Sequence, residues 1–310
     1  MNGWFVGIDG GGTKSTLLLH HADGTEHLGQ FGPLNANGNS YSEVDSSIHE
    51  ILSCMQKTMG SLSLCTSVCI GGAGVSNSNF ALFLKKRFAD SGFSGDLLLV
   101  GDHLTALADA FSGNDGVVLI SGTGSVCFGQ HGELTKRCGG YGYLIDDEGS
   151  GYAVGRDILS AVVKGADGRQ MPTVLEHAAL EMLGLSDITE LMQFLYSNSF
   201  SKKKVASLSV LLQEGIDNHD EASVRIEEKA LRHLQTMAAT VIHDLCLENG
   251  GLALRGGMLE NSVLFRQKLS RLLQNDFPNL LINTDKGNPA RGAVLLAMKE
   301  GLHGVQGLMV

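Results

Sequence analysis

Proline, aromatic residues and long apolar runs are scarce in this sequence. Only 4 of its 310 residues are proline and only 6% are aromatic. No stretch reaches the ~18 consecutive apolar residues that a membrane-spanning helix requires. Asp9 also interrupts the N-terminal apolar segment before the hydrophobic part of a secretory signal could form. The sequence therefore predicts a cytoplasmic protein with no membrane segment.

Positive charge is scarce as well, since 23 Lys and Arg face 33 Asp and Glu and the formal net charge is −10. The longest basic run is residues 202–204, which argues against a surface that binds a nucleic-acid backbone. The six cysteines form no C-x-x-C pair and no cluster with histidine at zinc spacing. We expect reduced structural thiols, with Cys65 and Cys69 facing the core rather than forming half of a metal site.

Glycine, in contrast, is abundant, with 41 residues, a fraction nearly double the usual ~7%. Because proline is so rare, this is not the composition of a flexible linker, and the glycines must serve particular positions. The length and the 43% hydrophobic content predict two folded domains, each with a core of its own.

The first 111 residues are predicted to form a three-stranded meander and then alternating helices and strands, which indicates an α/β domain. Ser42, Glu43 and Asp45 are the expected start signals of the first helix. The expected strands are residues 4–9, 15–20, 26–31, 66–72 and 96–101, and the expected helices are residues 42–59, 79–91 and 103–111.

The same order starts again at Gly116, with strands expected at 117–120, 126–128 and 134–138, and this indicates an internal duplication. A long helical region follows. Its last helix is predicted to bury Leu231, Leu234, Met237, Ala238, Val241 and Leu245. The remaining expected elements are helices 150–164, 172–183, 187–195, 202–215 and 221–248, strand 252–254, helix 260–275, strand 280–283 and helix 289–300.

Two glycine-rich hairpin tips occupy equivalent places in the two halves. Glycine lets backbone N–H groups converge into the concave nest that phosphate oxygens need, and nearby hydroxyls add donors. Either tip alone could be an ordinary tight turn, but a matching pair favours a nucleotide site. Neither tip has the spacing of a Walker A loop or of G-x-G-x-x-G. The candidate phosphate ligands are Gly11, Gly12, Thr13 and Lys14 in the first tip and Gly122, Thr123, Gly124 and Ser125 in the second.

Two aspartates stand at the ends of predicted strands. Asp9 comes directly before the first tip, where it either caps a turn or binds Mg²⁺, directly or through water. Asp102 stands between a strand and a helix, where it is either an N-cap or a general base for a hydroxyl that attacks a γ-phosphate.

The loop at residues 138–151 combines three acids with five glycines. Carboxylates accept paired hydrogen bonds from vicinal hydroxyls, so a neutral polyol is a fitting ligand. Asp147 and Glu148 could also stand at the N-terminus of the following helix because its dipole favours acids there. Asn35 and Asn37 either donate to the same ligand or form turns.

A further glycine pair, Gly256 and Gly257, lies between a predicted strand and a helix. Bare backbone at such a position would let a ribose or a flat ring approach closely. This is consistent with the nucleoside end of ATP.

In order along the chain, these motifs resemble those of the N-acetylglucosamine kinases, in the BadF/BadG/BcrA/BcrD ATPase group of the actin-like superfamily. The resemblance spans residues 7–292. It rests on Gly7-Ile8-Asp9-Gly10-Gly11-Gly12-Thr13-Lys14, Gly101-Asp102, Leu119-Ile120-Ser121-Gly122-Thr123-Gly124-Ser125, Gly139-Gly140-Tyr141-Gly142 with Asp147-Glu148-Gly149-Ser150, and Gly256-Gly257.

The resemblance implies an α/β fold of two ribonuclease-H-like domains around a cleft, in which one βββαβαβα core is duplicated. The second domain would carry the helical insertion, which offers apolar surface for a homodimer. We expect domains at residues 1–113 and 114–288, and a closing helix at 289–310 that packs back on the N-terminal domain.

The resemblance also implies transfer of the γ-phosphate of ATP, with Mg²⁺, to the 6-hydroxyl of an amino sugar, N-acetylglucosamine first. A glucosamine or N-acetylmuramic acid kinase, or an ATPase that activates a partner enzyme, remains open. Asp102 would be the base, Asp9 with Thr13 the metal and first phosphate site, and Gly256 and Gly257 the adenosine site. Relatives often have Trp where this chain has Tyr141. The implied sugar contacts are Asn35, Asp102, Thr123, Gly140, Tyr141, Gly142 and Asp147.

Overall fold

The computed structural model describes residues 3–35, 39–72 and 74–303. Its chain forms two compact units. Unit 1 consists of Met1–Asn114 together with Gly287–Val310, and unit 2 consists of Asp115–Lys286.

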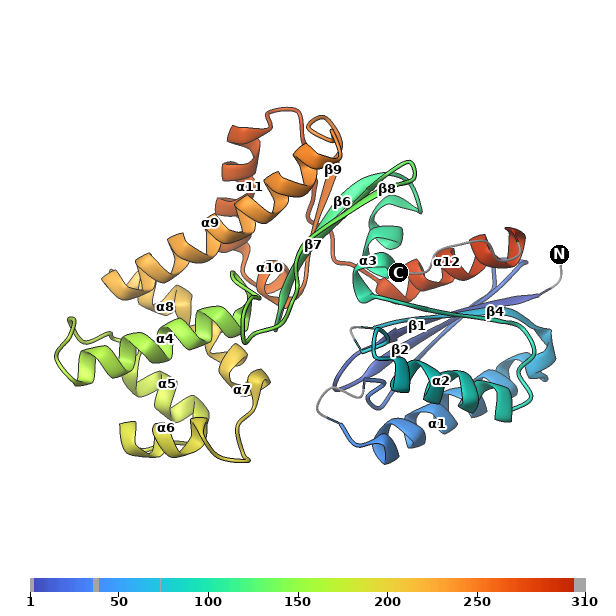
Figure 1. Ribbon diagram of the computed structural model, residues 1–310, viewed down its shortest axis with the longest axis horizontal. Helices are drawn as coiled ribbons and strands as arrows, with labels where there is room; N and C mark the ends of the chain where they lie inside the picture. The colour runs from blue at the N-terminus through green and yellow to red at the C-terminus, as the bar shows by residue number, and fades with distance from the viewer. Residues whose placement is uncertain (1–2, 36–38, 73, 304–310) are drawn as a thin grey trace. The chain divides into compact units, whose positions relative to one another are not determined.

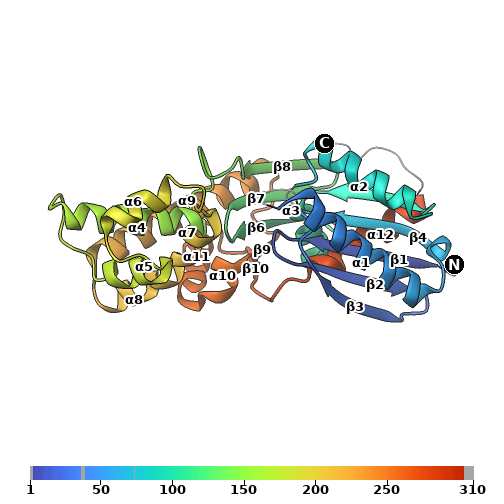
Figure 2. The same cartoon turned by 90° about the horizontal axis from the view of Figure 1, so that it is seen from below.

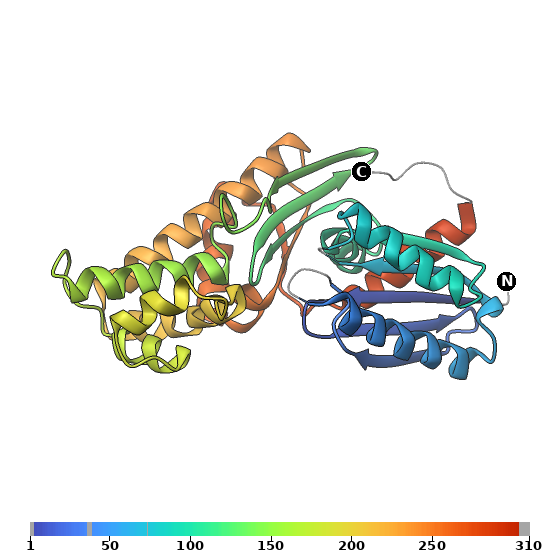
Figure 3. The same ribbon diagram turned by 60° about the horizontal axis from the view of Figure 1, so that its bottom comes forward.

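Unit 1 is a mixed five-stranded sheet with helices on both faces. Its strands lie in the order β3-β2-β1-β4-β5, with β1 antiparallel to β2 and parallel to β4. Helices α1 and α2 cover one face and α12 covers the other (Figures 1 and 3). The elements are β1 (Trp4–Gly10), β2 (Ser15–His21), β3 (Glu26–Phe31), α1 (Tyr41–Met59), the 3₁₀ turn Leu62–Leu64, β4 (Cys65–Gly71), α2 (Ser78–Asp90), β5 (Asp96–Val100), α3 (Asp102–Phe111) and α12 (Pro289–His303).

Strand β1 supplies both halves of the core of unit 1, because successive side chains point to opposite faces. Val6 and Ile8 are buried in the cluster that includes α1 and α2, whereas Phe5 packs with α12. A Cβ at Gly7 would lie only 2.1 Å from the carbonyl oxygen of Ala290, so α12 crosses β1 in close contact. The last helix of the chain therefore belongs to the core of unit 1.

Helix α1 begins one residue before the expected start, and its cap is Ser40 rather than Ser42. The Ser40 hydroxyl accepts the N–H of Glu43 at 3.2 Å, while Glu43 Oε2 accepts the N–H of Ser40 at 2.9 Å. This reciprocal capping box satisfies two backbone donors that a helix start leaves unpaired.

Unit 2 holds a second mixed five-stranded sheet, in the order β10-β9-β6-β7-β8 (Figure 2). Read from β8, its three antiparallel strands and two parallel strands follow one another as they do in unit 1. The elements are β6 (Gly116–Ser121), β7 (Ser125–His131), β8 (Leu134–Gly139), α4 (Gly151–Ala166), α5 (Glu176–Leu183), α6 (Ile188–Leu195), α7 (Lys202–Ser207), the 3₁₀ turn Leu208–Leu211, α8 (Leu212–Asp217), α9 (Glu221–Asp244), β9 (Gly251–Arg255), α10 (Gly257–Asn261), α11 (Val263–Asp276) and β10 (Leu281–Asn283).

Several expected helices of unit 2 are shorter or interrupted. The Thr173 hydroxyl donates to the Asp220 carboxylate at 3.0 Å and accepts the Leu175 N–H, which keeps this segment out of α5. The expected helix 260–275 is divided into α10 and α11 at Ser262, where the backbone is extended. The expected helix 202–215 is divided by a 3₁₀ turn, and α9 ends at Asp244.

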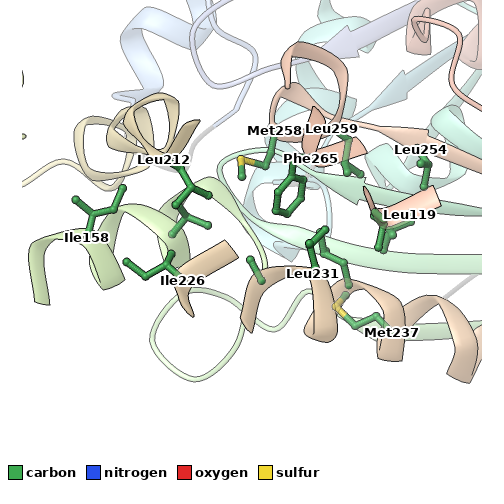
Figure 4. Close-up of a cluster of buried hydrophobic side chains, with 14 of the residues drawn as sticks. Leu119, Ile158, Leu212, Ile226, Leu231, Met237, Leu254, Met258, Leu259 and Phe265 are labelled. Carbon is green, nitrogen blue, oxygen red and sulfur yellow. The ribbon is translucent and has the colours of Figure 1, made fainter. Parts of the chain in front are cut away.

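The core of unit 2 is built around α9. Its predicted buried residues are all buried, which confirms the helical spacing (Figure 4). Leu231 and Met237 of α9 pack in one cluster with Leu119 of β6 and Phe265 of α11. The buried face of a long amphipathic helix thus joins the sheet to the helices that follow β8.

Each of the six cysteines is a free thiol. Cys65 and Cys69 are buried, as predicted, and burial raises the pKa of both thiols to about 12. In the described part of the chain no helix has the length and apolar character needed to cross a membrane.

Candidate active site

The first glycine tip, residues 11–14, closes the hairpin of β1 and β2. It is mostly exposed, and it is tied to the loop that follows β3. Asn39 Nδ2 donates to the carbonyl of Gly12 at 3.1 Å and to that of Asn35 at 2.9 Å. Asn35, a predicted sugar contact, is therefore held beside the tip, and only 8% of it is exposed. Asn37, the alternative contact, lies outside the described residues.

Asp9 and Asp102 are brought to the same edge of the sheet. Asp9 is at the carboxyl end of β1 and Asp102 follows β5, while β4 lies between these two strands. Burial and, to a smaller extent, the negative charge of Asp102 together raise the pKa of Asp9 to about 6, and the positive charge of Lys14 opposes them. Two predicted site residues that are distant in sequence thus interact electrostatically.

Asp102 is not the N-cap of α3, because that position is occupied by Gly101. The Asp102 carboxylate accepts the backbone N–H of His103 at 3.0 Å, and its side chain is 46% exposed. Its Oδ1 is 3.8 Å from His103 Nδ1. The acid is thus fixed at the first turn of the helix and open to a ligand, as a general base requires.

The end of β4 is a feature that the sequence reasoning missed. A Cβ at Gly71 would lie 2.5 Å from Thr105 Cγ2, and one at Gly72 would lie 2.9 Å from the carbonyl oxygen of Gly10. Both positions are buried and fit only glycine, so β4 ends without a side chain between the ends of β1 and β5. A signal was present, since a glycine-rich run follows this strand as it follows β1 and β6.

The donor set around Asp9 suits a hard cation. Mg²⁺ is usually held by one or two carboxylates, with water and substrate phosphates as its other ligands. Here the half-buried Asp9 carries charge that the neighbouring acid destabilises, and a divalent cation would relieve this. Within the described ranges no group of three or more His, Cys, Asp and Glu side chains could hold a metal by itself. The phosphates would therefore have to complete the coordination.

The second tip, residues 122–124, is anchored to the loop that precedes α4. The Ser121 hydroxyl donates to the Gly149 carbonyl at 2.8 Å, and the Ser125 hydroxyl donates to the Glu148 carbonyl at 2.7 Å. The hydroxyl of Ser125, a predicted phosphate donor, is thus used inside the protein. Thr123 remains exposed at the apex.

Asp147 packs directly against this tip. Its backbone is left-handed, with φ 64°, and the residue is 4% exposed. One carboxylate oxygen accepts the Ser125 N–H at 3.4 Å, and the other accepts Lys202 Nζ at 2.8 Å. A Cβ at Gly124 would lie 2.9 Å from Asp147 Oδ2, so only glycine fits there without movement. The contact with Lys202 was not foreseen from sequence.

Gly256 and Gly257 lie beside the second tip. Gly256 has φ 92°, and a Cβ on it would lie 2.5 Å from the carbonyl oxygen of Ser121. A Cβ at Gly122 would lie 3.6 Å from the Gly257 nitrogen. The predicted phosphate and adenosine segments of unit 2 are therefore neighbours.

The predicted sugar loop turns sharply. Gly140 and Gly142 have φ values of 81° and 98°, which only glycine adopts readily. Tyr141 between them is 70% exposed, its N–H donates to Asp146 Oδ2 at 2.9 Å, and the Arg137 guanidinium lies 5.3 Å from its ring centroid. The aromatic ring is thus available at the surface of the loop.

The model of the BadF/BadG/BcrA/BcrD ATPase family matches residues 6–297. The chain belongs to this family. It is 32% identical to the N-acetylmuramic acid/N-acetylglucosamine kinase of Clostridium acetobutylicum over 96% of this chain and 99% of that protein. It is 31% identical to the N-acetyl-D-glucosamine kinase of Dictyostelium discoideum over 95% of this chain and 97% of that protein.

Among solved structures, the chain resembles one from Chromobacterium violaceum, whose assignment as an N-acetylglucosamine kinase is provisional. The TM-score is 0.76 at 24% identity, and the match covers 96% of this chain and 99% of the other. This likeness shows that the two chains share a fold.

Proposed function

We propose that this protein is an ATP-dependent sugar kinase that transfers the γ-phosphate to the 6-hydroxyl of an amino sugar, with N-acetylglucosamine as the first candidate. Its two units would be the two ribonuclease-H-like domains of such a kinase. Membership in an ATPase family and two curated relatives named as amino-sugar kinases support the proposal. The observation that carries it is the convergence of Asp9 and Asp102 beside the first glycine tip.

Asp102 is the proposed catalytic base. Its carboxylate would accept the proton of the sugar hydroxyl as the oxygen attacks the phosphorus atom, and the O–P bond to the ADP leaving group would break. Its backbone anchor at the start of α3 and its exposure support this role. Asn35, held beside the first tip, would orient the sugar.

Asp9 is the proposed residue for Mg²⁺, acting directly or through water. The metal would neutralise phosphate charge as the γ-phosphate is transferred. Gly11, Gly12, Thr13 and Lys14 would bind phosphate oxygens beside it. The raised pKa of Asp9 supports this assignment, because a nearby cation would favour the ionised carboxylate.

In unit 2, the tip at residues 122–124 would bind phosphate, and Gly256 with Gly257 would accept the adenosine. Tyr141 and Asp147 would contact the sugar together with the flanking glycines and Thr123. The contact between the second tip and the Gly256 segment supports the nucleotide assignment. Because the Ser125 hydroxyl is engaged by the Glu148 carbonyl, its backbone N–H and the apex residues are the better donors to phosphate.

N-acetylmuramic acid is the second candidate substrate, because the relative from Clostridium acetobutylicum is named for both sugars. Discrimination between sugars that differ by one substituent depends on the shape of the pocket around that group.

The test is ADP release from Mg-ATP with N-acetylglucosamine, N-acetylmuramic acid, glucosamine, N-acetylmannosamine, glucose or no sugar. We expect a strong rise with N-acetylglucosamine, and phosphorus NMR of the product should place the phosphate on the 6-oxygen. Equal slow hydrolysis in every reaction would contradict the kinase proposal and favour an ATPase that acts on a partner protein.

A further inference from the structure

Lys202 makes a buried contact that nothing in the proposed reaction yet explains. It is the first residue of α7, and its ammonium group lies 2.8 Å from Asp147 Oδ2. The side chain of Asp147 is only 6% exposed, whereas that of Lys202 is 31% exposed. Among the described residues, Lys202 is the only basic side chain that forms an ion pair with Asp147.

Aromatic rings surround this ion pair on the side of Lys202. Its Nζ lies 5.2 Å from the ring centroid of Tyr143 and 5.9 Å from that of Tyr152. These two rings meet edge to face at 4.9 Å, and Tyr143 also approaches Phe200 at 6.4 Å. Cation–π attraction and the ion pair therefore hold the ammonium group in one place.

The geometry links three segments of unit 2. Tyr143 and Asp147 belong to the predicted sugar loop, Tyr152 belongs to α4, and Lys202 comes from the helices inserted after it. The left-handed backbone of Asp147 leaves its carboxylate between the Ser125 N–H and the ammonium group. A carboxylate has about four acceptor sites, so these two bonds do not use the full acceptor capacity of Asp147.

Removing the lysine would leave a buried carboxylate without its counter-charge, which is costly and would favour a shift of the loop or protonation. A shifted or protonated Asp147 would accept hydrogen bonds from hydroxyls less well. The effect would reach the sugar without any contact between Lys202 and the sugar.

We propose that Lys202 is a positioning residue for sugar binding, which holds the Asp147 carboxylate in place and neutralises it, and so couples the inserted helices to the sugar loop. This rests on the proposed function, because it takes Asp147 as a sugar contact. The residue is not catalytic, since it acts through Asp147.

The test compares Lys202→Met, Lys202→Arg, Asp147→Asn and the double variant Asp147→Asn/Lys202→Met, with Lys204→Met as the control. Lys204 is an exposed lysine of the same helix, and its ammonium group lies over Phe194 instead. Binding of N-acetylglucosamine is measured by calorimetry without ATP. Michaelis constants for sugar and ATP, and melting temperatures, are measured in parallel.

We expect Lys202→Met to weaken N-acetylglucosamine binding by roughly 10- to 100-fold, with a matching rise in the KM for sugar. The KM for ATP should change by less than about threefold. A general loss of structure would instead raise both Michaelis constants. Lys202→Arg should recover most of the affinity, and Lys204→Met should bind like the wild type. In the Asp147→Asn background, loss of Lys202 should have no further effect on sugar affinity.

Wild-type sugar affinity in Lys202→Met would overturn the inference, as would a further loss in the Asp147→Asn background or equal rises in both Michaelis constants. These results would leave the kinase proposal intact. A wild-type protein that neither binds nor phosphorylates any amino sugar would overturn the proposed function, and this inference with it.

Discussion

The two glycine tips have equivalent places in their sheets but very different surroundings. No atom of the described residues comes within 4 Å of a Cβ built at Gly12 in the first tip. In the second tip, a Cβ at Gly124 would press against the Asp147 carboxylate. The first tip is therefore open at Gly12, and the second is packed against its own loop at Gly124.

The acids beside the tips differ in the same way. Asp147 is neutralised by Lys202 inside unit 2, whereas Asp9 makes no ion pair within 4 Å among the described residues and is destabilised by Asp102. A buried acid that is paired internally keeps a loop in place, and one left with unfavourable charge favours an added cation. The two halves of the duplication thus differ in charge balance, since the acid of unit 2 is paired within the protein and that of unit 1 is not.

The largest effect should come from the open edge of unit 1. We expect Asp102→Asn to lower kcat by ~10²–10⁴ because the amide cannot accept the proton of the attacking hydroxyl. Asp96→Asn is the matched control, since Asp96 is exposed at the opposite end of β5. Steady-state ADP release with N-acetylglucosamine measures both. Near-wild-type turnover of Asp102→Asn would remove the base assignment.

The internal pairing of unit 2 can be broken at a second site. Glu227 of α9 is 5% exposed and accepts both its hydrogen bonds from Lys268 Nζ of α11, at 2.6 and 2.8 Å. Lys268→Met should lower the free energy of unfolding by about 2–3 kcal/mol, less than for a fully buried pair, because Lys268 is 42% exposed.

Arg225→Met is the control for this change, since Arg225 pairs with Glu221 on the exposed side of α9. It should change the free energy of unfolding by less than about 0.5 kcal/mol. Urea unfolding measures both variants. Equal losses in the free energy of unfolding would mean that burial of the acid does not determine how much stability the lost ion pair costs.

The two tips can be compared by replacing one glycine in each with alanine. Gly124→Ala should lower the free energy of unfolding by roughly 1–3 kcal/mol, because the new Cβ would crowd Asp147. Gly12→Ala should leave stability nearly unchanged, yet raise the KM for ATP if its bare backbone receives phosphate. Thermal unfolding and kinetics together check this. A stability loss in Gly12→Ala equal to that in Gly124→Ala would contradict the contrast between an open and a packed tip.

The smallest effect should be a gain of stability at Asp9. Its pKa is raised to about 6 in the folded protein, so between pH ~4 and ~6 the folded state keeps a proton that the unfolded chain releases. The stability that comes from the protonated acid is present at low pH and is lost as the pH rises through about 6.

Asp9→Asn cannot ionise and should therefore gain about 1–2 kcal/mol near pH 7.5 and nothing near pH 4. Urea unfolding at both pH values, without nucleotide, measures this. Added Mg²⁺ with ATP should reverse the gain if Asp9 is the metal ligand, because only the wild type would then be stabilised by binding the metal. A gain of the same size at both pH values would show that charge is not its cause.

Local patterns in the sequence were sufficient for much of the fold. Alternating apolar residues and glycine turns predicted the hairpins that form both tips, and the spacing of Leu234 and Val241 predicted the buried face of α9. These features depend on residues that are neighbours along one element. The cap of α1 was misplaced by two residues, because Ser40 and Ser42 are both suitable caps and only the reach of Glu43 decides between them.

Local patterns were also sufficient to predict the repeated order of strands and helices, the family, and the two acids at the carboxyl ends of β1 and β5. Which of the acids is neutralised, and by which residue, depends on contacts that form only in the folded chain. Lys202 lies 55 residues from Asp147, and α12 packs on β1 from the other end of the chain. Charge pairing and close packing act through space, so the same acid beside a glycine tip can hold a loop in one unit and remain open to a metal ion in the other.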